Sequence, residues 1–156
     1  SLHINAAASS NPSGLTLLGN YGFNTIIGSP FNDLLNGNRG NDTLTGGGGI
    51  DTIRFDSTLN ATTNRDTITD FNPAEDRIEL ENSIFTALPG GGTLAASAFG
   101  FGLSATTPDH RILYDNSTGR LTYDSNGSAS GGSIVFAVIL PTGLGAAMHA
   151  GLFSVT

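Results

Sequence analysis

The stretch GNYGFNTIIGSPFNDLLNGNRGNDTLTGGGGIDTIR, residues 19–54, repeats one pattern every nine residues. Three registers keep this step: one is apolar, one is glycine, and one is Asn or Asp. The apolar register holds Leu17, Ile26, Leu35, Leu44 and Ile53, the glycine register holds Gly19, Gly28, Gly37 and Gly46, and the polar register holds Asn24, Asp33, Asp42 and Asp51. A short period shared by three registers indicates a repeat architecture.

Each nine-residue unit has a turn half and a strand half. The turn half is rich in glycine, which permits positive φ and lets neighbouring turns approach closely. The strand half, such as residues 43–45, places one apolar side chain between two polar ones, as expected for a strand with one buried residue. Two units then make one full coil, and successive coils stack their strands in parallel. The sequence therefore predicts a parallel β-roll with the apolar register as its core.

This coil length places polar side chains of successive turns next to one another. Asp33 is expected to face Asp51, and Asn24 to face Asp42. Glycine-rich turns expose backbone carbonyls, and Ca²⁺ takes about 6–8 oxygens from carboxylates and carbonyls. Because one turn offers too few ligands, two stacked turns must share an ion. In the alternative interpretation, each Asp only caps its own turn through side chain to backbone hydrogen bonds.

The units resemble the G-G-x-G-x-D-x-U-x repeat of the repeats-in-toxin (RTX) calcium-binding family, most closely over residues 28–54. In that family the earlier turn supplies carbonyls from its second and fourth positions, and the later turn from its first and third. The resemblance implies a first calcium site of Ser29, Phe31, Asp33, Gly46, Gly48 and Asp51. It implies a second site of Asn20, Gly22, Asn24, Gly37, Arg39 and Asp42. The second site is expected to be weaker or empty, because Asn24 offers only a neutral oxygen.

The repeat breaks after Phe55, and Asp66-Thr67-Ile68 restores the spacing of Asp and apolar residue. RTX rolls often end in a similar Asp-x-Ile-x-Asp-Phe segment, here residues 66–71. The resemblance implies a third site in which Asp66 faces Asp42 together with Asn38 and Gly40, with Asp56 as a competing ligand. We therefore assign residues 1–71 to the roll.

Residues 72–156 are expected to form a β-rich C-terminal cap. The predicted elements are a short helical turn at 95–99, a hairpin of 111–115 and 120–124, a strand at 133–140 that is apolar on both faces, and a final strand at 151–156. A roll leaves unpaired strand edges, which antiparallel strands can cover. The predicted fold class is all-β: a parallel β-roll of nonapeptide repeats followed by an antiparallel β-rich cap.

Composition excludes several classes of function. With 13 acidic residues against 6 Lys and Arg, the net charge of −7 disfavours nucleic acid and anionic membranes as partners. No apolar run approaches the roughly 18 residues of a membrane span. The absence of cysteine excludes disulfides and thiolate metal sites. No zinc, nucleophile-elbow or phosphate-loop motif occurs, so we predict no catalysis here, although the parent protein could carry an upstream catalytic domain.

The resemblance implies a calcium-binding module of a larger secreted, extracellular protein. RTX modules fold when they meet calcium outside the cell, and their C-terminus carries a signal for the type I secretion machinery. Residues 152–156 stand in that place, although Gly151 replaces the acidic residue that often precedes the signal. The alternative is an adhesive, surface-layer or polysaccharide-binding accessory module, whose partner would be an extracellular glycan or surface ligand.

Overall fold

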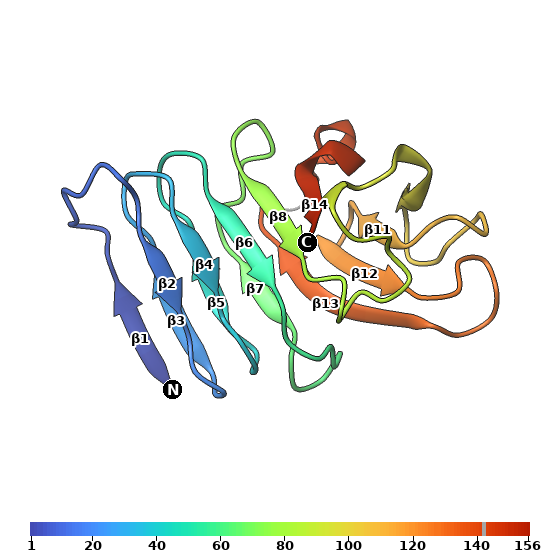
Figure 1. Ribbon diagram of the computed structural model, residues 1–156, viewed down its shortest axis with the longest axis horizontal. Coiled ribbons are helices and arrows are strands. Elements are labelled where there is room, and N and C mark those ends of the chain that lie inside the picture. The colour runs from blue at the N-terminus through green and yellow to red at the C-terminus, as the bar shows by residue number, and fades with distance from the viewer. Residues whose placement is uncertain (142) are drawn as a thin grey trace.

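Two β-sheets lie face to face along the molecule (Figure 1), and the computed structural model describes residues 1–141 and 143–156. The first sheet has the order β1-β3-β5-β7-β13-β12-β11-β10, and the second β2-β4-β6-β8-β14-β9. The first contains β1 (Leu2–Asn5), β3 (Asn24–Ile27), β5 (Thr43–Thr45), β7 (Asp66–Ile68), β10 (Phe99–Phe101), β11 (Ile112–Asp115), β12 (Arg120–Asp124) and β13 (Ser133–Ile139). The second contains β2 (Thr16–Leu18), β4 (Leu34–Asn36), β6 (Thr52–Phe55), β8 (Arg77–Leu80), β9 (Gly92–Thr93) and β14 (Phe153–Val155).

Three short 3₁₀ helices interrupt the strands: η1 (Ala96–Ala98), η2 (Gly145–Ala147) and η3 (Ala150–Leu152). The first of them confirms the helical turn that we predicted at 95–99. Within the described part of the chain, no helix has the length and apolarity required to cross a membrane.

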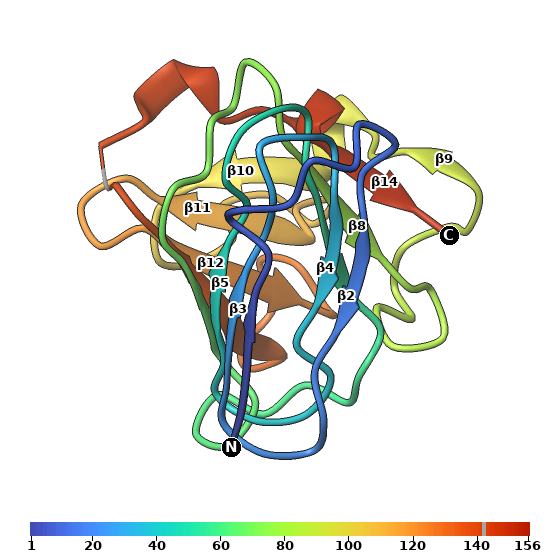
Figure 2. The ribbon, with the colours of Figure 1, turned by 90° about the vertical axis from the view of Figure 1, so that its left-hand side faces the viewer.

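Parallel pairing follows the predicted coil. Leu17 pairs with Leu35 and Leu35 with Ile53, so each residue pairs with the one that lies two nonapeptides further on. The chain alternates between the two sheets, so each coil adds one strand to each, as the view along the stack shows (Figure 2). The predicted parallel β-roll is therefore confirmed.

The apolar register forms the core of the roll. Leu17 is 8% exposed, and Ile26, Leu35, Leu44 and Ile53 are 0% exposed. Burying one such side chain is worth about 1.5–3 kcal/mol. With only one inward residue in most strands, this core is thin, and the turns must contribute to stability.

Strand β1 was not predicted. Its Ile4 pairs with Ile26, which lies further along the chain than two nonapeptides, because the turn at 6–15 is longer than a regular turn of the roll. Because of the longer turn, the residues of β1 do not follow the nine-residue spacing in the sequence, although the strand pairs in parallel with β3 in the same sheet.

The cap extends both sheets of the roll. The predicted hairpin is present as β11 and β12, which pair antiparallel, and β12 pairs antiparallel with β13. Strand β13 joins the roll by parallel pairing with β7, and β14 by parallel pairing with β8. The cap is thus β-rich and largely antiparallel, but parallel pairs attach it to the roll.

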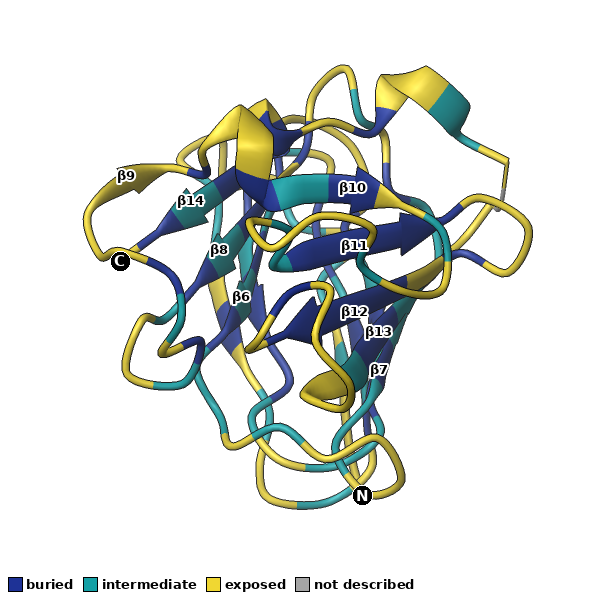
Figure 3. Ribbon diagram, turned by 90° about the vertical axis from the view of Figure 1, so that its right-hand side faces the viewer, coloured by how far each residue is buried: buried dark blue, intermediate teal, exposed yellow. Residues whose placement is uncertain are grey.

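Roll and cap share an aromatic cluster. The ring centroids of Phe55 and Phe136 are 5.0 Å apart, and Phe85 lies 5.1 Å from Tyr123 and 5.2 Å from Phe136. Seen from the cap end, β11 and β12 are buried and the loops around them are exposed (Figure 3).

The predicted strand at 133–140 is buried less completely than expected, because Ile134, Val135 and Val138 are only half-buried. Parallel stacking also continues beyond residue 71, since β6 pairs with β8. The division of the chain at residue 71 therefore remains a prediction.

Candidate metal centre

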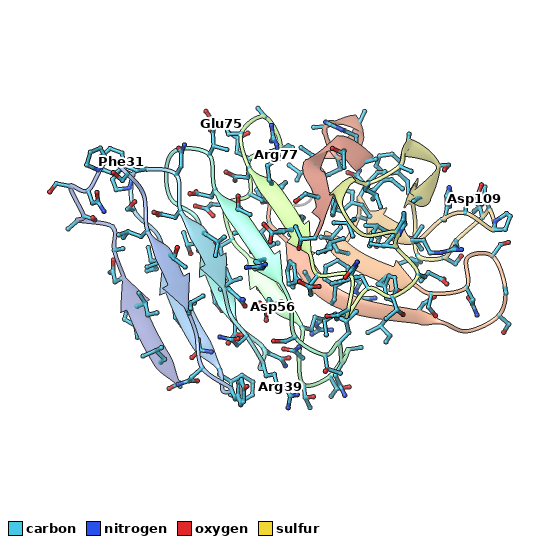
Figure 4. The ribbon with its side chains drawn as sticks, in the orientation of Figure 1. Phe31, Arg39, Asp56, Glu75, Arg77 and Asp109 are labelled. Atoms are coloured by element: carbon cyan, nitrogen blue, oxygen red, sulfur yellow. The ribbon has the colours of Figure 1, made fainter. Side chains whose placement is uncertain are left out.

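The turns that connect the two sheets stack at two edges of the roll. One edge, here called the Phe31 edge, stacks turns 28–33, 46–51 and 69–76. The other, the Arg39 edge, stacks turns 19–24, 37–42 and 56–65. Figure 4 shows Phe31 and Glu75 at the upper edge and Arg39 at the lower one.

A ladder of carboxylates runs along the Phe31 edge. The N–H of Leu15 donates to Asp33 Oδ1 at 2.7 Å, the N–H of Asp33 to Asp51 Oδ1 at 2.8 Å, and the N–H of Asp51 to Asp76 Oδ1 at 3.0 Å. Each carboxylate thus binds the backbone of the preceding coil. Asp33 and Asp51 face each other as the coil length required.

The same ladder runs along the Arg39 edge. The N–H of Asn24 donates to Asp42 Oδ1 at 2.7 Å, and the N–H of Asp42 donates to Asp66 Oδ1 at 3.0 Å. The insertion at 56–65 therefore keeps Asp66 in register with the earlier turns. Within it, Asn64 Oδ1 accepts the N–H of Gly40 at 2.9 Å.

The residues predicted for the first site lie together. Asp33 accepts the N–H of Ser29 on Oδ2 at 2.5 Å, and Ser29 O accepts the N–H of Gly48 at 3.1 Å. A Cβ on Gly28 would lie 2.0 Å from Gly46 O and 2.7 Å from Asp33 Oδ2, so these oxygens converge on a space that only glycine leaves free. Phe31 joins the group through its N–H, which donates to Ser29 Oγ at 3.2 Å.

The residues predicted for the second site surround the side chain of Asn24. Its Nδ2 lies near four oxygens: Gly22 O at 2.5 Å, Asp42 Oδ1 at 2.8 Å, Asn20 O at 3.0 Å and Gly37 O at 3.3 Å. Arg39 is the predicted member outside this group. Its guanidinium lies 5.3 Å from the ring centroid of Tyr21.

Only some of the residues predicted for the third site contact one another. Asp42 and Asp66 meet, whereas Asn38 donates its side-chain Nδ2 to Gly19 O at 2.8 Å and Gly40 contacts Asn64. The competing ligand Asp56 accepts a hydrogen bond from Asn36 Nδ2 at 2.9 Å and lies 3.9 Å from Arg54 Nε.

Two acidic residues of the Phe31 edge were missed by the sequence analysis. Asp76 extends the ladder, and Asp70 accepts the N–H groups of Gly46 and Gly47, both at 2.9 Å. A signal for Asp76 was available, because Asp76-Arg77-Ile78 repeats the spacing of Asp51-Thr52-Ile53. It was obscured because the segment from Asp51 to Asp76 is longer than the two nonapeptides of a regular coil.

Burial opposes the ionisation of the ladder carboxylates. It raises the pKa of Asp51 to about 6, with the charges of Asp76 and Asp33 adding to the effect, and raises the pKa of Asp66 to about 8. Burial also raises the pKa of Asp42 and Asp76. Inward-facing carboxylates that resist ionisation favour a bound cation, which offsets both desolvation and repulsion.

The oxygen set fits a hard cation. Asp42 Oδ2 is buried, and no donor among the described residues reaches it. No cluster of three or more His, Cys, Asp or Glu that could hold a metal occurs in residues 1–141 and 143–156. A cation at either edge would be held by carboxylate oxygens together with backbone carbonyls, the mixture that Ca²⁺ takes.

The raised pKa values predict that protonation of the ladder carboxylates at low pH stabilises the fold in place of a bound cation. In calcium-free buffer the folded state binds more protons than the unfolded chain, whose Asp pKa is about 3.9, so stability falls as pH rises through the folded pKa values of about 6 and 8. Lowering the pH of chelator-treated chain from 8.5 to 5 is expected to increase its β-strand circular dichroism. A signal that stays flat or falls over this range would contradict the account.

The match to a known family agrees with this geometry. A family model described as the RTX calcium-binding nonapeptide repeat matches residues 18–53 in four copies. No curated protein matches the chain. Among solved structures, the AlgE6R3 subunit of the Azotobacter vinelandii mannuronan C5-epimerase is similar with a TM-score of 0.38 and 23% identity, covering 84% of this chain and 74% of that one.

The family match lies on the part of the chain that carries the regular repeats and the first two predicted sites. RTX nonapeptide repeats bind calcium. The hard-cation geometry of the two edges, together with this match, leads to one conclusion: residues 18–53 are RTX calcium-binding nonapeptide repeats.

Proposed function

We propose that the chain is a module that folds on binding calcium outside the cell and carries a C-terminal signal for type I secretion. The two ladders of buried carboxylates are the main support. Among the described residues, the ion pairs are those of Arg54 with Asp56 and Glu79, and neither involves a ladder carboxylate. The ladders therefore depend on a charge from outside the protein.

Calcium is scarcer inside the cell than outside it, so ladders that depend on bound calcium would form only outside the cell. Extracellular modules bind Ca²⁺ with Kd of about 10⁻⁴–10⁻³ M. The calcium concentration in the cytosol is too low to fill sites of such weak affinity. A preformed site does not exist in an unfolded chain, so the free energy of calcium binding becomes free energy of folding. The chain would stay extended inside the cell and fold after release.

The place of the C-terminus supports a signal that is read before folding. Strand β14 lies between β8 and β9, and Phe153 and Val155 are buried there. A receptor could reach these side chains only in the unfolded chain. Low calcium inside the cell would thus keep the signal accessible.

Export from cells that carry a type I secretion apparatus tests this proposal. Deleting residues 151–156 is expected to abolish release of the chain into the medium. The matched control deletes residues 128–132, which form part of the exposed loop between β12 and β13 and lie outside the proposed signal. Equal release of both variants would contradict a C-terminal signal.

The second candidate, a polysaccharide-binding module, is favoured by one surface feature. Tyr21 is 79% exposed, and the guanidinium of Arg39 lies over its ring, a combination that suits an acidic sugar. Arg54 adds nothing to it, because its Nε lies 3.0 Å from Glu79 Oε1. Binding of the calcium-loaded chain to glycans and cell surfaces distinguishes the two candidates.

A further inference from the structure

The side-chain amide of Asn24 lies where a cation would lie between turns 19–24 and 37–42. We propose that Asn24 is a built-in substitute for calcium, so that this corner of the roll closes without an ion. The inference rests on the calcium-dependent folding proposed above for the other turns. It assigns Asn24 a role opposite to that of a ligand.

The oxygens around Asn24 Nδ2 outnumber what an amide can use. Four of them lie within 3.3 Å, whereas an NH₂ group has two hydrogens to donate. They come from both stacked turns: Asn20 and Gly22 belong to the earlier one, and Gly37 and Asp42 to the later one. This cage of carbonyl and carboxylate oxygens has the composition of a hard-cation site.

The orientation of the amide is fixed by its other end. Asn24 Oδ1 accepts the N–H of Asn20 at 3.4 Å, while Nδ2 points into the cage. Rotating the amide by half a turn would set Oδ1 against the four oxygens and Nδ2 against a backbone donor. The hydrogen-bond network therefore selects the orientation in which nitrogen occupies the cage.

Charge also separates this corner from its counterpart at the Phe31 edge. There Asp33 and Asp51 bring two carboxylates, whereas here Asn24 is neutral and Asp42 supplies the only one between these two turns. One carboxylate attracts Ca²⁺ less strongly than two. The partly positive NH₂ group of the buried Asn24 donates to Asp42 Oδ1 at 2.8 Å and so offsets part of that single charge.

The test is to convert the substitute back into a ligand. In Asn24→Asp the cage gains a second carboxylate and loses its nitrogen. Calorimetric titration is expected to show one more bound Ca²⁺ per chain than in wild type, and the variant is expected to lose more β-strand circular dichroism in chelator. The matched control is Asn5→Asp, which adds the same charge at an exposed position and keeps an oxygen to accept the N–H of Ala7.

The outcomes separate this inference from the proposed function. An additional ion in Asn24→Asp but not in Asn5→Asp supports it, and an unchanged number of ions in Asn24→Asp overturns it. If wild type binds no calcium at all, the function proposed for the module fails as well. If Asn24→Asp does not fold, ¹⁵N-labelled wild type decides: the Asn24 side-chain amide hydrogens should remain protected from exchange at saturating calcium, and rapid exchange overturns the inference.

Discussion

Removing calcium at pH 8 is expected to abolish most of the β-strand circular dichroism of the folded chain. At about 10⁻³ M calcium and a Kd of about 10⁻⁴ M, each filled site contributes about 1.4 kcal/mol. Two such sites, one at each edge, would supply about 3 kcal/mol, which is comparable with the stability of a domain at the lower end of the usual range of roughly 5–15 kcal/mol. Emptying them also leaves the carboxylates of Asp33, Asp51, Asp42 and Asp66 buried and close together. The thin core of the roll cannot offset both losses.

The measurement is circular dichroism before and after a chelator, followed by addition of Ca²⁺ or Mg²⁺. Calcium should restore the strand signal. Magnesium should not, because it is smaller, requires octahedral geometry and gives up its water reluctantly. A strand signal that survives in chelator, or that magnesium restores equally well, would show that the Asp side chains only cap turns.

Replacing Asp51 by Asn is expected to weaken calcium binding more than any other single removal of a carboxylate. Asp51 is the middle member of the Phe31 ladder, since it accepts the N–H of Asp33 and donates its own N–H to Asp76. Its carboxylate can therefore serve ions on both sides. Asn keeps an oxygen for the N–H of Asp33, so the variant removes charge with little change of shape.

Calorimetry should show affinity lower by about tenfold or more for Asp51→Asn, in line with the effect of ligand charge on calcium sites. Asp109→Asn is the matched control, because Asp109 is exposed in the cap, far from both edges (Figure 4). Asn24→Ala removes no carboxylate, so it should change calcium binding less than Asp51→Asn does. Equal effects of the Asp51 and Asn24 substitutions would contradict our ranking of the two corners.

The regular part of the roll could be predicted because its information is local and repeated. A strict nine-residue step sets the coil, and the coil sets which residues pair, so Leu35 and Ile53 were placed correctly without any structure. The step fails where a turn changes length. Asp66 was recovered across the insertion by its spacing to Ile68, whereas Asp76 and strand β1 were missed because their turns are longer than the regular ones.

Two further features depend on contacts that the sequence does not encode locally. The hairpin of β11 and β12 was visible in its turn residues, but the parallel pairing of β13 with β7 joins segments that are far apart in the chain. The nitrogen of Asn24 in an oxygen cage depends on where four backbone and side-chain oxygens converge. At the level of sequence, Asn24 is only a neutral residue in an acidic register.

Because successive strands alternate between the two sheets, an even and an odd number of added nonapeptides would change the stack in different ways. An added pair of nonapeptides would lengthen the molecule by one layer of about 4.7–4.9 Å and leave every other strand in its own sheet. An added single nonapeptide would transfer all preceding strands to the opposite sheet and exchange the two rows of turns. Growth of such a module is therefore expected in whole coils, two nonapeptides at a time.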